Sequence, residues 1–536
     1  MAVSVLPDSP EGRSAPLVRL PAIPLRIWLL RAVALALLLA ASLDGLAAIA
    51  AGIAYYKGAG NPEIAAKRIA LLNAAEAGQA VDTPSKVEEY AGSTVALVGS
   101  VSSPTYAYGK DSIAEHLLVY NVMGKEKAAM LMVHSLLGGV CMLFGGLQFW
   151  PAFRRRFPKW HRGFGGIYII VLQGTMITAM IHLARTSVAD TLDHLFFYVG
   201  LWGLALGISL SLWMAVHALW RKQIAQHQAW MCISYGLLLS TPIQRYGWLL
   251  FGALDPDIRF TEANYAVTGV LIPLSLTVGY LLFTINRWVQ PVRRAESASK
   301  MTAVSEGRAR LARNMALVSF PALVAAAAIV VQYYMVTPAL EQAFSARELV
   351  PAGVIHLHDT VIASGGVSRA TFALATLVGL LSGAHLLWIA FVRRQPKGVL
   401  GTPSWALAFS GAVAGIVLMY WGLRMGMPSF ATLAGGSMHM IGGAATLLFA
   451  ALLALALRRG EVAWVKEWGV FVLACIAATP TFYFLLPIMG AFGFDAQWVR
   501  EGHIFRLALA GQWLVAIMGA FIYAAYGQAT QSRLAR

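Results

Sequence analysis

Two histidines of this chain stand in the same local arrangement. His134 is closely followed by Gly138–Gly139 and His439 by Gly442–Gly443, each time within a long apolar stretch. A neutral imidazole in hydrocarbon needs a hydrogen-bond partner or a metal. Two helices that each carry a histidine at matching depth can hold a haem iron, and nearby glycines leave room for the porphyrin. We therefore predict His134 and His439 as ligands of haem b iron, with small-residue packing between helices as the alternative for the glycines.

Three further histidines are candidates for the second iron ligand. His194 and His503 begin apolar stretches at corresponding places of the two halves of the chain. His182 matches the depth of His134 better but has no counterpart in the second half. Haem propionates bind cations. Arginines near the same ends of the apolar stretches are candidates for binding the propionates. The alternative is that their side chains extend to the membrane surface. These arginines are Arg245, Arg424 and Arg506.

A second polar group is expected at the opposite ends of the apolar stretches. It consists of His161, Arg162, His217 and His227. These side chains can bind a second haem, a metal or the head group of a quinone. Capping of helix ends and contacts with lipid phosphates are the alternatives. No Walker motif, HExxH zinc site or nucleophile elbow occurs, so no catalytic residue is predicted, and whether the protein is an enzyme is left open.

The composition indicates a protein that spans a membrane many times. Hydrophobic residues make up 58% of the 536 residues and charged residues only 12%, and the mean hydropathy is +0.65. A soluble protein of this size needs more charge on its surface. The net charge of +16 comes from basic residues in short loops, where membrane topology explains them, so nucleic acid is excluded as a partner. The three cysteines form no C-x-x-C pair.

Hydropathy predicts twelve membrane-spanning helices of about 20 residues each. They are expected at 27–55, 126–149, 164–186, 195–219, 229–252, 263–286, 313–337, 366–392, 404–423, 431–457, 467–487 and 504–526. Basic loops alternate with acidic loops along the chain. Because positive loops stay inside, both termini are expected in the cytoplasm of a bacterium, with the chain in its inner membrane.

The fold class predicted is therefore all-α, a polytopic membrane protein with two six-helix halves and a small extracytoplasmic insertion. A charged, Ser/Ala-rich segment marks the boundary between the halves. The expected organisation is a cytoplasmic tail at 1–23, a first anchor at 24–55, the extracytoplasmic domain at 56–125, a helical module at 126–286, a cytoplasmic linker at 287–312, a second six-helix module at 313–527 and a cytoplasmic tail at 528–536.

An ordered set of motifs in residues 126–252 resembles the bacterial membrane family catalogued as domain of unknown function 2306. The residues that match its pattern are His134, His161, Arg162, Gly165, Tyr168, His227, Trp230, Met231, Ser234, Tyr235 and Arg245. The chain departs from it at Gly166, Gln228 and Ile233, where the family usually has arginine. The resemblance implies a four-helix membrane module and carries no settled activity. The second half is not matched to a named family.

These patterns leave three hypotheses for the function. The first is a b-type haem protein that transfers electrons, with a quinone or another redox partner. The second is a secondary transporter, because twelve helices in two six-helix halves is a common carrier architecture. The third is a non-catalytic factor in membrane assembly or lipid interaction. The lipid bilayer is the expected environment in all three.

Overall fold

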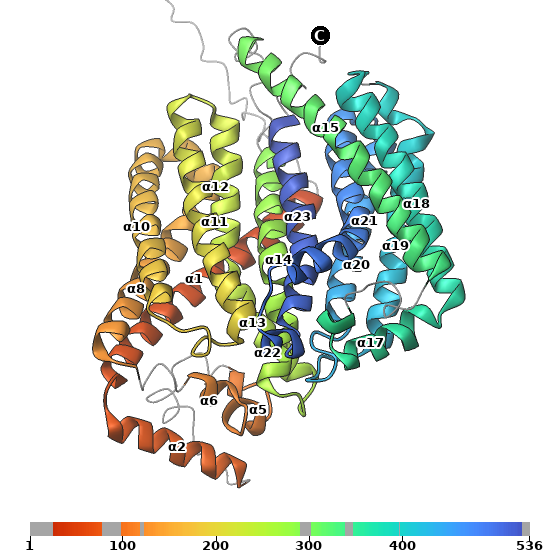
Figure 1. The fold of residues 1–536 in the computed structure, drawn as a ribbon. Helices are drawn as coiled ribbons and strands as arrows, with labels where there is room; N and C mark the ends of the chain where they lie inside the picture. The colour runs from red at the N-terminus through yellow and green to blue at the C-terminus, as the bar shows by residue number, and fades with distance from the viewer. Residues whose placement is uncertain are drawn as a thin grey trace, which may run out of the picture.

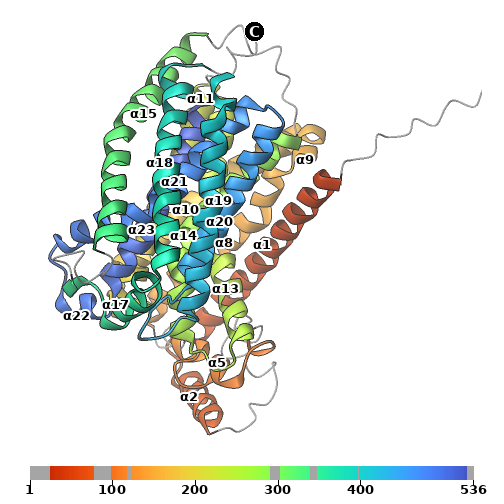
Figure 2. The same cartoon turned by 90° about the vertical axis from the view of Figure 1, so that its right-hand side faces the viewer.

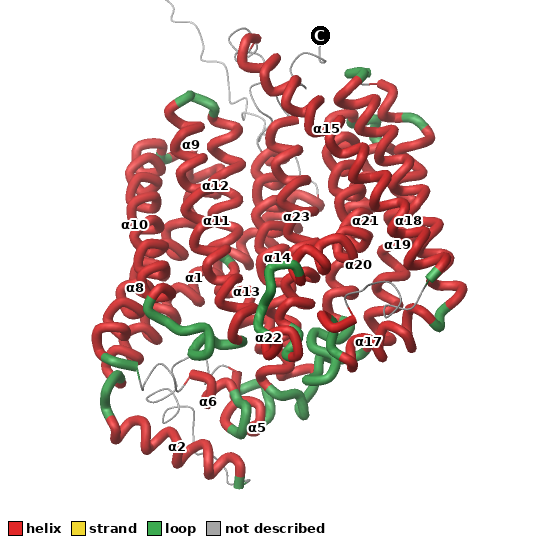
Figure 3. The backbone as a smooth tube through the Cα atoms, viewed as in Figure 1, coloured by secondary structure: helices red, strands yellow, loops and turns green. Residues whose placement is uncertain are grey.

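The computed structural model describes residues 25–77, 98–117, 123–289, 302–337, 347–395 and 397–527. Within these ranges every regular element is a helix, and the β-type pairing is limited to an isolated bridge between Ser429 and Leu433 (Figure 3). The prediction of an all-α polytopic membrane protein is confirmed.

Eleven of the described helices are long and apolar enough to cross a membrane. Their apolar parts have 21 to 29 residues, which at ~1.5 Å per residue spans the ~30 Å of hydrocarbon. They are α1 (Leu25–Gly58), α8 (Lys125–Phe149), α10 (Pro158–Ala184), α11 (His194–Trp220), α14 (Phe260–Val289), α15 (Thr302–Val330) with its π-helical continuation η1 (Val331–Val336), α18 (Gly366–Leu387) with η4 (Trp388–Val392), α19 (Thr402–Met425), α20 (Ser437–Arg458), α21 (Val462–Gly490) and α23 (His503–Gly527).

The span expected at 229–252 is divided into two shorter helices. They are α12 (Ile224–Leu238) and α13 (Ser240–Leu254), which meet at Leu239. Pro242 lies in the first turn of α13. A proline has no N–H to donate and disfavours helical backbone in the residue before it, so a break just upstream of it is expected physically. Hydropathy averages across such a break and therefore predicts one continuous span.

The helices form two bundles that lie side by side (Figure 1). One holds α1, α8 and α10 to α13, and the other holds α15 and α18 to α21. Helices α14 and α23, one from each half of the chain, pack against each other between the bundles. The view turned by 90° shows α1 inclined along one edge of the molecule and α15 along another (Figure 2).

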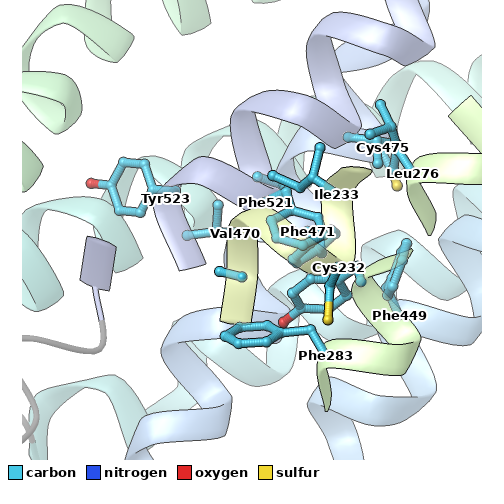
Figure 4. Close-up of a cluster of buried hydrophobic side chains, with 14 of the residues drawn as sticks. Cys232, Ile233, Leu276, Phe283, Phe449, Val470, Phe471, Cys475, Phe521 and Tyr523 are labelled. Carbon is cyan, nitrogen blue, oxygen red and sulfur yellow. The ribbon is translucent and has the colours of Figure 1, made fainter. Parts of the chain in front are cut away.

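Buried apolar side chains pack the contact between the halves (Figure 4). Phe283 of α14 stacks on Phe521 of α23, with 6.0 Å between ring centroids. Tyr280 of α14 lies 4.1 Å from Phe471 of α21, again between centroids. Such aromatic pairs add ~0.5–1.5 kcal/mol each beyond the area that they bury. The two halves are therefore packed as one continuous core.

The insertion between the first two spans packs onto one end of the bundle. Its described helices are α2 (Pro62–Glu76), α5 (Pro104–Tyr108) and α6 (Ile113–Leu117). Tyr106 is buried and donates a hydrogen bond to the carbonyl of Trp248 in α13, at 2.9 Å. Burial raises the pKa of Tyr106. We call this the insertion end of the bundle, and the end that carries α9 (Pro151–Arg156) the opposite end.

Short helices cover the insertion end of the second bundle. They are α17 (Ala352–His358), the π-helical η3 (Asp359–Ala363) and α22 (Ala496–Arg500), with the short η2 (Arg347–Leu349) before them. A further turn, η5 (Lys397–Leu400), lies between α18 and α19. Residues 302–312 of the expected linker form the first turns of α15, and its residues 290–301 lie outside the described part of the chain.

We predict that Gly236→Ala destabilises the first bundle. A Cβ atom on Gly236 of α12 would lie 2.7 Å from the carbonyl oxygen of Ser275 in α14, and backbone cannot move aside easily. Overpacking of this kind costs ~1–3 kcal/mol, so the thermal unfolding temperature in detergent should fall. The matched control is Gly200→Ala in α11, where a Cβ meets no atom within 4 Å. Equal melting of both variants would contradict the prediction.

Candidate functional site

A buried ion pair joins the two halves near the insertion end. Arg506 of α23 binds Asp193, the residue before α11, with Nη1 to Oδ1 and Nη2 to Oδ2 both at 2.6 Å. Each side chain is only 1% exposed. Nη2 also donates to the hydroxyl of Thr268 in α14, at 2.8 Å. One arginine therefore holds together three helices, of which two belong to the other half. We call this set the ionic contact.

The surroundings of Arg506 replace the water that it has lost. Its guanidinium carbon lies 4.1 Å from the ring centroid of Phe196 and 4.4 Å from that of Tyr265. A cation between two aromatic faces is stabilised by ~0.5–2 kcal/mol for each ring. Arg506 was expected to bind a haem propionate. Its two terminal nitrogens instead face a carboxylate of the protein.

The two histidines that begin corresponding stretches meet beside the ionic contact. The rings of His194 and His503 lie 6.1 Å apart, and Trp498 packs against both at 5.8 and 5.4 Å between centroids. His194 is exposed, whereas the Nε2 of His503 lies 3.0 Å from a carboxylate oxygen of Glu501. The two histidines at corresponding places of the two halves thus lie next to each other, and the indole of Trp498 packs against both rings.

The first predicted iron ligand is bonded to a neighbouring helix. The Nδ1 of His134 lies 2.9 Å from the carbonyl oxygen of Thr175 in α10, so it donates and leaves Nε2 as the acceptor. His182 of α10 is an electrostatic neighbour of His134. Metal-bound histidines usually donate their second nitrogen to such a carbonyl. The orientation of His134 therefore fits a ligand, although the same bond also satisfies a neutral imidazole.

The glycines beside these histidines face other helices. A Cβ on Gly139 would lie 2.5 Å from the carbonyl of Gly45 in α1, and one on Gly443 would lie 2.6 Å from the carbonyl of Gly415 in α19. A Cβ on Gly442 would overlap the ring of Trp513. The space that was expected to admit a porphyrin is filled by protein at these three positions. Small-residue packing, the alternative reading, accounts for them.

The other two arginines have partners of their own. Arg245 of α13 binds Asp44 of α1, with Nη1 2.6 Å from Oδ1, and Asp44 is buried. Arg424 is exposed and donates to the hydroxyl of Tyr420 one turn earlier, at 3.1 Å. Two of the three expected propionate partners are thus held by carboxylates. The set does not fit a propionate site in this structure.

At the opposite end the structure brings together part of the expected group. The Nδ1 of His227 in α12 lies 3.0 Å from the carbonyl oxygen of Ala215 in α11. His161 of α10 has His227, Arg154 and Arg162 as electrostatic neighbours, and its Nδ1 has no hydrogen-bond partner in the described part of the chain. His217 is exposed in the last turn of α11.

A second polar contact between the halves lies towards the opposite end. The hydroxyl of Tyr280 in α14 donates to a carboxylate oxygen of Glu467 in α21, and Glu467 is buried. Thr268 and Tyr280 are twelve residues apart on α14, so this contact lies ~18 Å from the ionic contact along the helix. We call it the tyrosine–carboxyl contact. Glu467 was not predicted as a site residue, because a charged residue near the end of an apolar stretch is normally taken to mark where the membrane span begins.

The second half contains a cavity of about 80 Å³ near the insertion end. His439, predicted as an iron ligand, lines it together with His358, Tyr334 and Tyr483. The Nε2 of His358 lies 3.5 Å from the Tyr483 hydroxyl, which donates to that of Tyr334 at 3.3 Å. Burial lowers the pKa of His358, so its imidazole is neutral at pH 7.

The fold and its long apolar helices define a polytopic membrane protein. Residues 131–283 match the family described as Predicted membrane protein (DUF2306). The match runs from α8 into α14 and confirms the resemblance found in the sequence, over a longer stretch than the 126–252 expected. The second half lies outside the matched residues. The comparisons with curated proteins and with solved structures give no match.

We predict that Arg506→Met is strongly destabilising because it leaves the buried carboxylate of Asp193 without its cation. Removal of one partner of such a pair costs ~3–5 kcal/mol. The double variant Asp193→Leu with Arg506→Met removes both charges and should recover most of that loss. Thermal unfolding in detergent gives the comparison. A double variant as unstable as the single one would show that charge pairing is not the source of the effect.

Proposed function

We propose that the protein is a secondary transporter whose two halves move against each other. The observation that carries the proposal is the pair of buried polar contacts between the halves, one near each end of the bundle. The ionic contact joins Asp193 and Arg506, and the tyrosine–carboxyl contact joins Tyr280 and Glu467. Alternating access requires contacts between the halves that can open at one end while the other stays closed.

Buried polar contacts suit this role better than apolar ones. When water enters one end, it can solvate a carboxylate, a guanidinium or a hydroxyl and so offset the loss of their mutual bonds. Apolar surface gains nothing from water. Buried apolar side chains, among them Leu271 and Leu276 of α14, lie between the two contacts along the bundle. The described conformation then corresponds to a state that is closed at both ends.

We infer the orientation from charge. The short connection between α8 and α10, which carries Arg154–Arg156 on α9, lies at the opposite end, and short basic connections stay in the cytoplasm. The insertion would then be extracytoplasmic and both termini cytoplasmic, in the inner membrane of a bacterium.

The proposal predicts reciprocal accessibility in a background without the three native cysteines. Met438→Cys reports on the insertion end, since Met438 lies against Gly269 of the other half. Phe283→Cys reports on the opposite end, since Phe283 follows Tyr280 by three residues on α14 and packs on Phe521 of the other half. Arg506→Gln should raise modification at position 438 by an impermeant maleimide about tenfold, the effect of ~1.4 kcal/mol, and lower it at position 283. Glu467→Gln should do the reverse.

Sealed vesicles of each orientation allow both ends to be measured separately. The matched control is Arg424→Gln, which removes an exposed arginine at the same end as Arg506 and should change neither reporter. If Arg506→Gln and Glu467→Gln each raise the modification of the cysteine at their own end without lowering it at the other end, the halves do not alternate and the proposal fails.

A haem b protein is the second candidate, favoured by the orientation of two imidazoles. His134 and His227 each donate Nδ1 to a carbonyl of a neighbouring helix, as metal-bound histidines do. A bound haem would supply one-electron redox chemistry, with a quinone or a protein as its partner. The glycines and arginines around the predicted ligands do not fit a porphyrin in this structure, so we rank this candidate below transport.

A reduced-minus-oxidised visible spectrum of protein expressed with ample haem tests this candidate. If His134 is an axial ligand, His134→Ala should abolish or shift one haem b band, because the iron loses a strong-field nitrogen. His385→Ala is the control, since His385 is exposed at the opposite end of α18. Absence of any haem band in the unmodified protein would remove the candidate.

A further inference from the structure

The cavity of the second half has the mostly apolar lining with a few polar groups that is typical of ligand-binding sites. It is lined by aromatic and aliphatic side chains from α17, α19, α20, α21 and α23, among which stand the imidazoles of His358 and His439. Two of its lining residues come from π-helical segments, Tyr334 from η1 and Ile362 from η3. Single turns of π-helix are rare and occur frequently at functional sites. The backbone irregularities thus coincide with the cavity.

One buried polar atom at the cavity lacks a partner. The Nδ1 of His439 is shielded from solvent and makes no hydrogen bond within the described part of the chain. Buried polar groups are nearly always hydrogen-bonded, and each exception calls for an explanation. The Tyr483 hydroxyl lies on the same wall, where it links His358 and Tyr334 through hydrogen bonds. A molecule in the cavity can complete this hydrogen bonding.

The lining sets the charge and the size of that molecule. No aspartate, glutamate, lysine or arginine is among the lining residues, and an ion buried without a counter-charge costs far more than a neutral polar group. The volume of about 80 Å³ is roughly half that of a cavity of ~150 Å³ that admits benzene. An uncharged molecule of about three or four non-hydrogen atoms fits this volume.

Helix α17 separates the cavity from the surface. Its residues Val354, Leu357 and His358 face the cavity, whereas Ile355 and His356 line an open depression of about 610 Å³ at the insertion end. The helix has seven residues and leads directly into η3. A ligand can therefore collect in the depression and enter past one short helix.

We propose that this cavity binds a small uncharged molecule that carries a hydroxyl group, which completes the hydrogen bonding of His439. A hydroxyl both donates and accepts, so it pairs with His439 Nδ1 in either tautomer. The site lies wholly within the second half and requires no movement of the halves. Its success or failure is therefore independent of the transport proposal.

The test uses 2-fluoroethanol as the probe and fluorine NMR saturation transfer on the purified full-length protein. We expect a saturable signal with 2-fluoroethanol and none with fluoroacetate, whose charge the cavity cannot offset. Ala434→Leu fills the cavity, since Ala434 is a buried lining residue, and should abolish the saturable part. Ala444→Leu is the matched control, because Ala444 is exposed on α20, and should leave binding unchanged.

A second variant tests the polar partner. His439→Leu replaces the imidazole with an apolar side chain of similar reach and should weaken binding about fivefold to tenfold, the effect of losing one hydrogen bond. Thermal unfolding shows whether each variant remains folded. Equal binding by Ala434→Leu and Ala444→Leu, or no saturable signal in the unmodified protein, would overturn the proposal. Equal binding of fluoroacetate would overturn the assignment of an uncharged ligand.

Discussion

The ion pair of Asp193 and Arg506 is the contact on which the arrangement of the two halves depends. Its members are 313 residues apart in the chain and share two bonds of 2.6 Å. Two charges that have lost their water are tolerated only when each has the other in place. The pair therefore requires the start of α11 and the start of α23 to meet in one position. Asp193 meets this requirement with a left-handed backbone, φ 58°, which aspartate tolerates better than most residues.

The sequence predicted Arg506 as a site residue but not Asp193 or the pairing of the two. Length and hydropathy placed nearly every helix, because each must cross the same thickness of hydrocarbon. The same reasoning put His194, His503 and Arg506 at one end. It could not bring Arg506 to Asp193, since that contact depends on how two independently predicted bundles pack. Glu467 was missed for a related reason, because its partner Tyr280 belongs to the other half.

The histidine–glycine pattern illustrates why a motif alone is ambiguous. The same residues recur in both halves, but His134 is bonded to the carbonyl of Thr175, whereas His439 lines a cavity. Glycine permits close approach whether the neighbour is a cofactor or a helix, and only the packing decides. Here Gly139 and Gly443 adjoin backbone carbonyls of α1 and α19. The pattern thus predicted close approach at these glycines, and neighbouring helices provide it at Gly139 and Gly443.

The order of contacts between the halves has an energetic consequence. Charged groups meet near the insertion end, and towards the opposite end a tyrosine meets a carboxyl group beside stacked aromatic rings. Water can replace the polar bonds at either end but cannot replace the dispersion contacts of the rings. Opening at one end therefore costs less than complete separation of the halves. When the insertion end opens, the aromatic rings around Tyr280 act as the pivot, and they keep the tyrosine–carboxyl contact in register while the ionic contact is solvated.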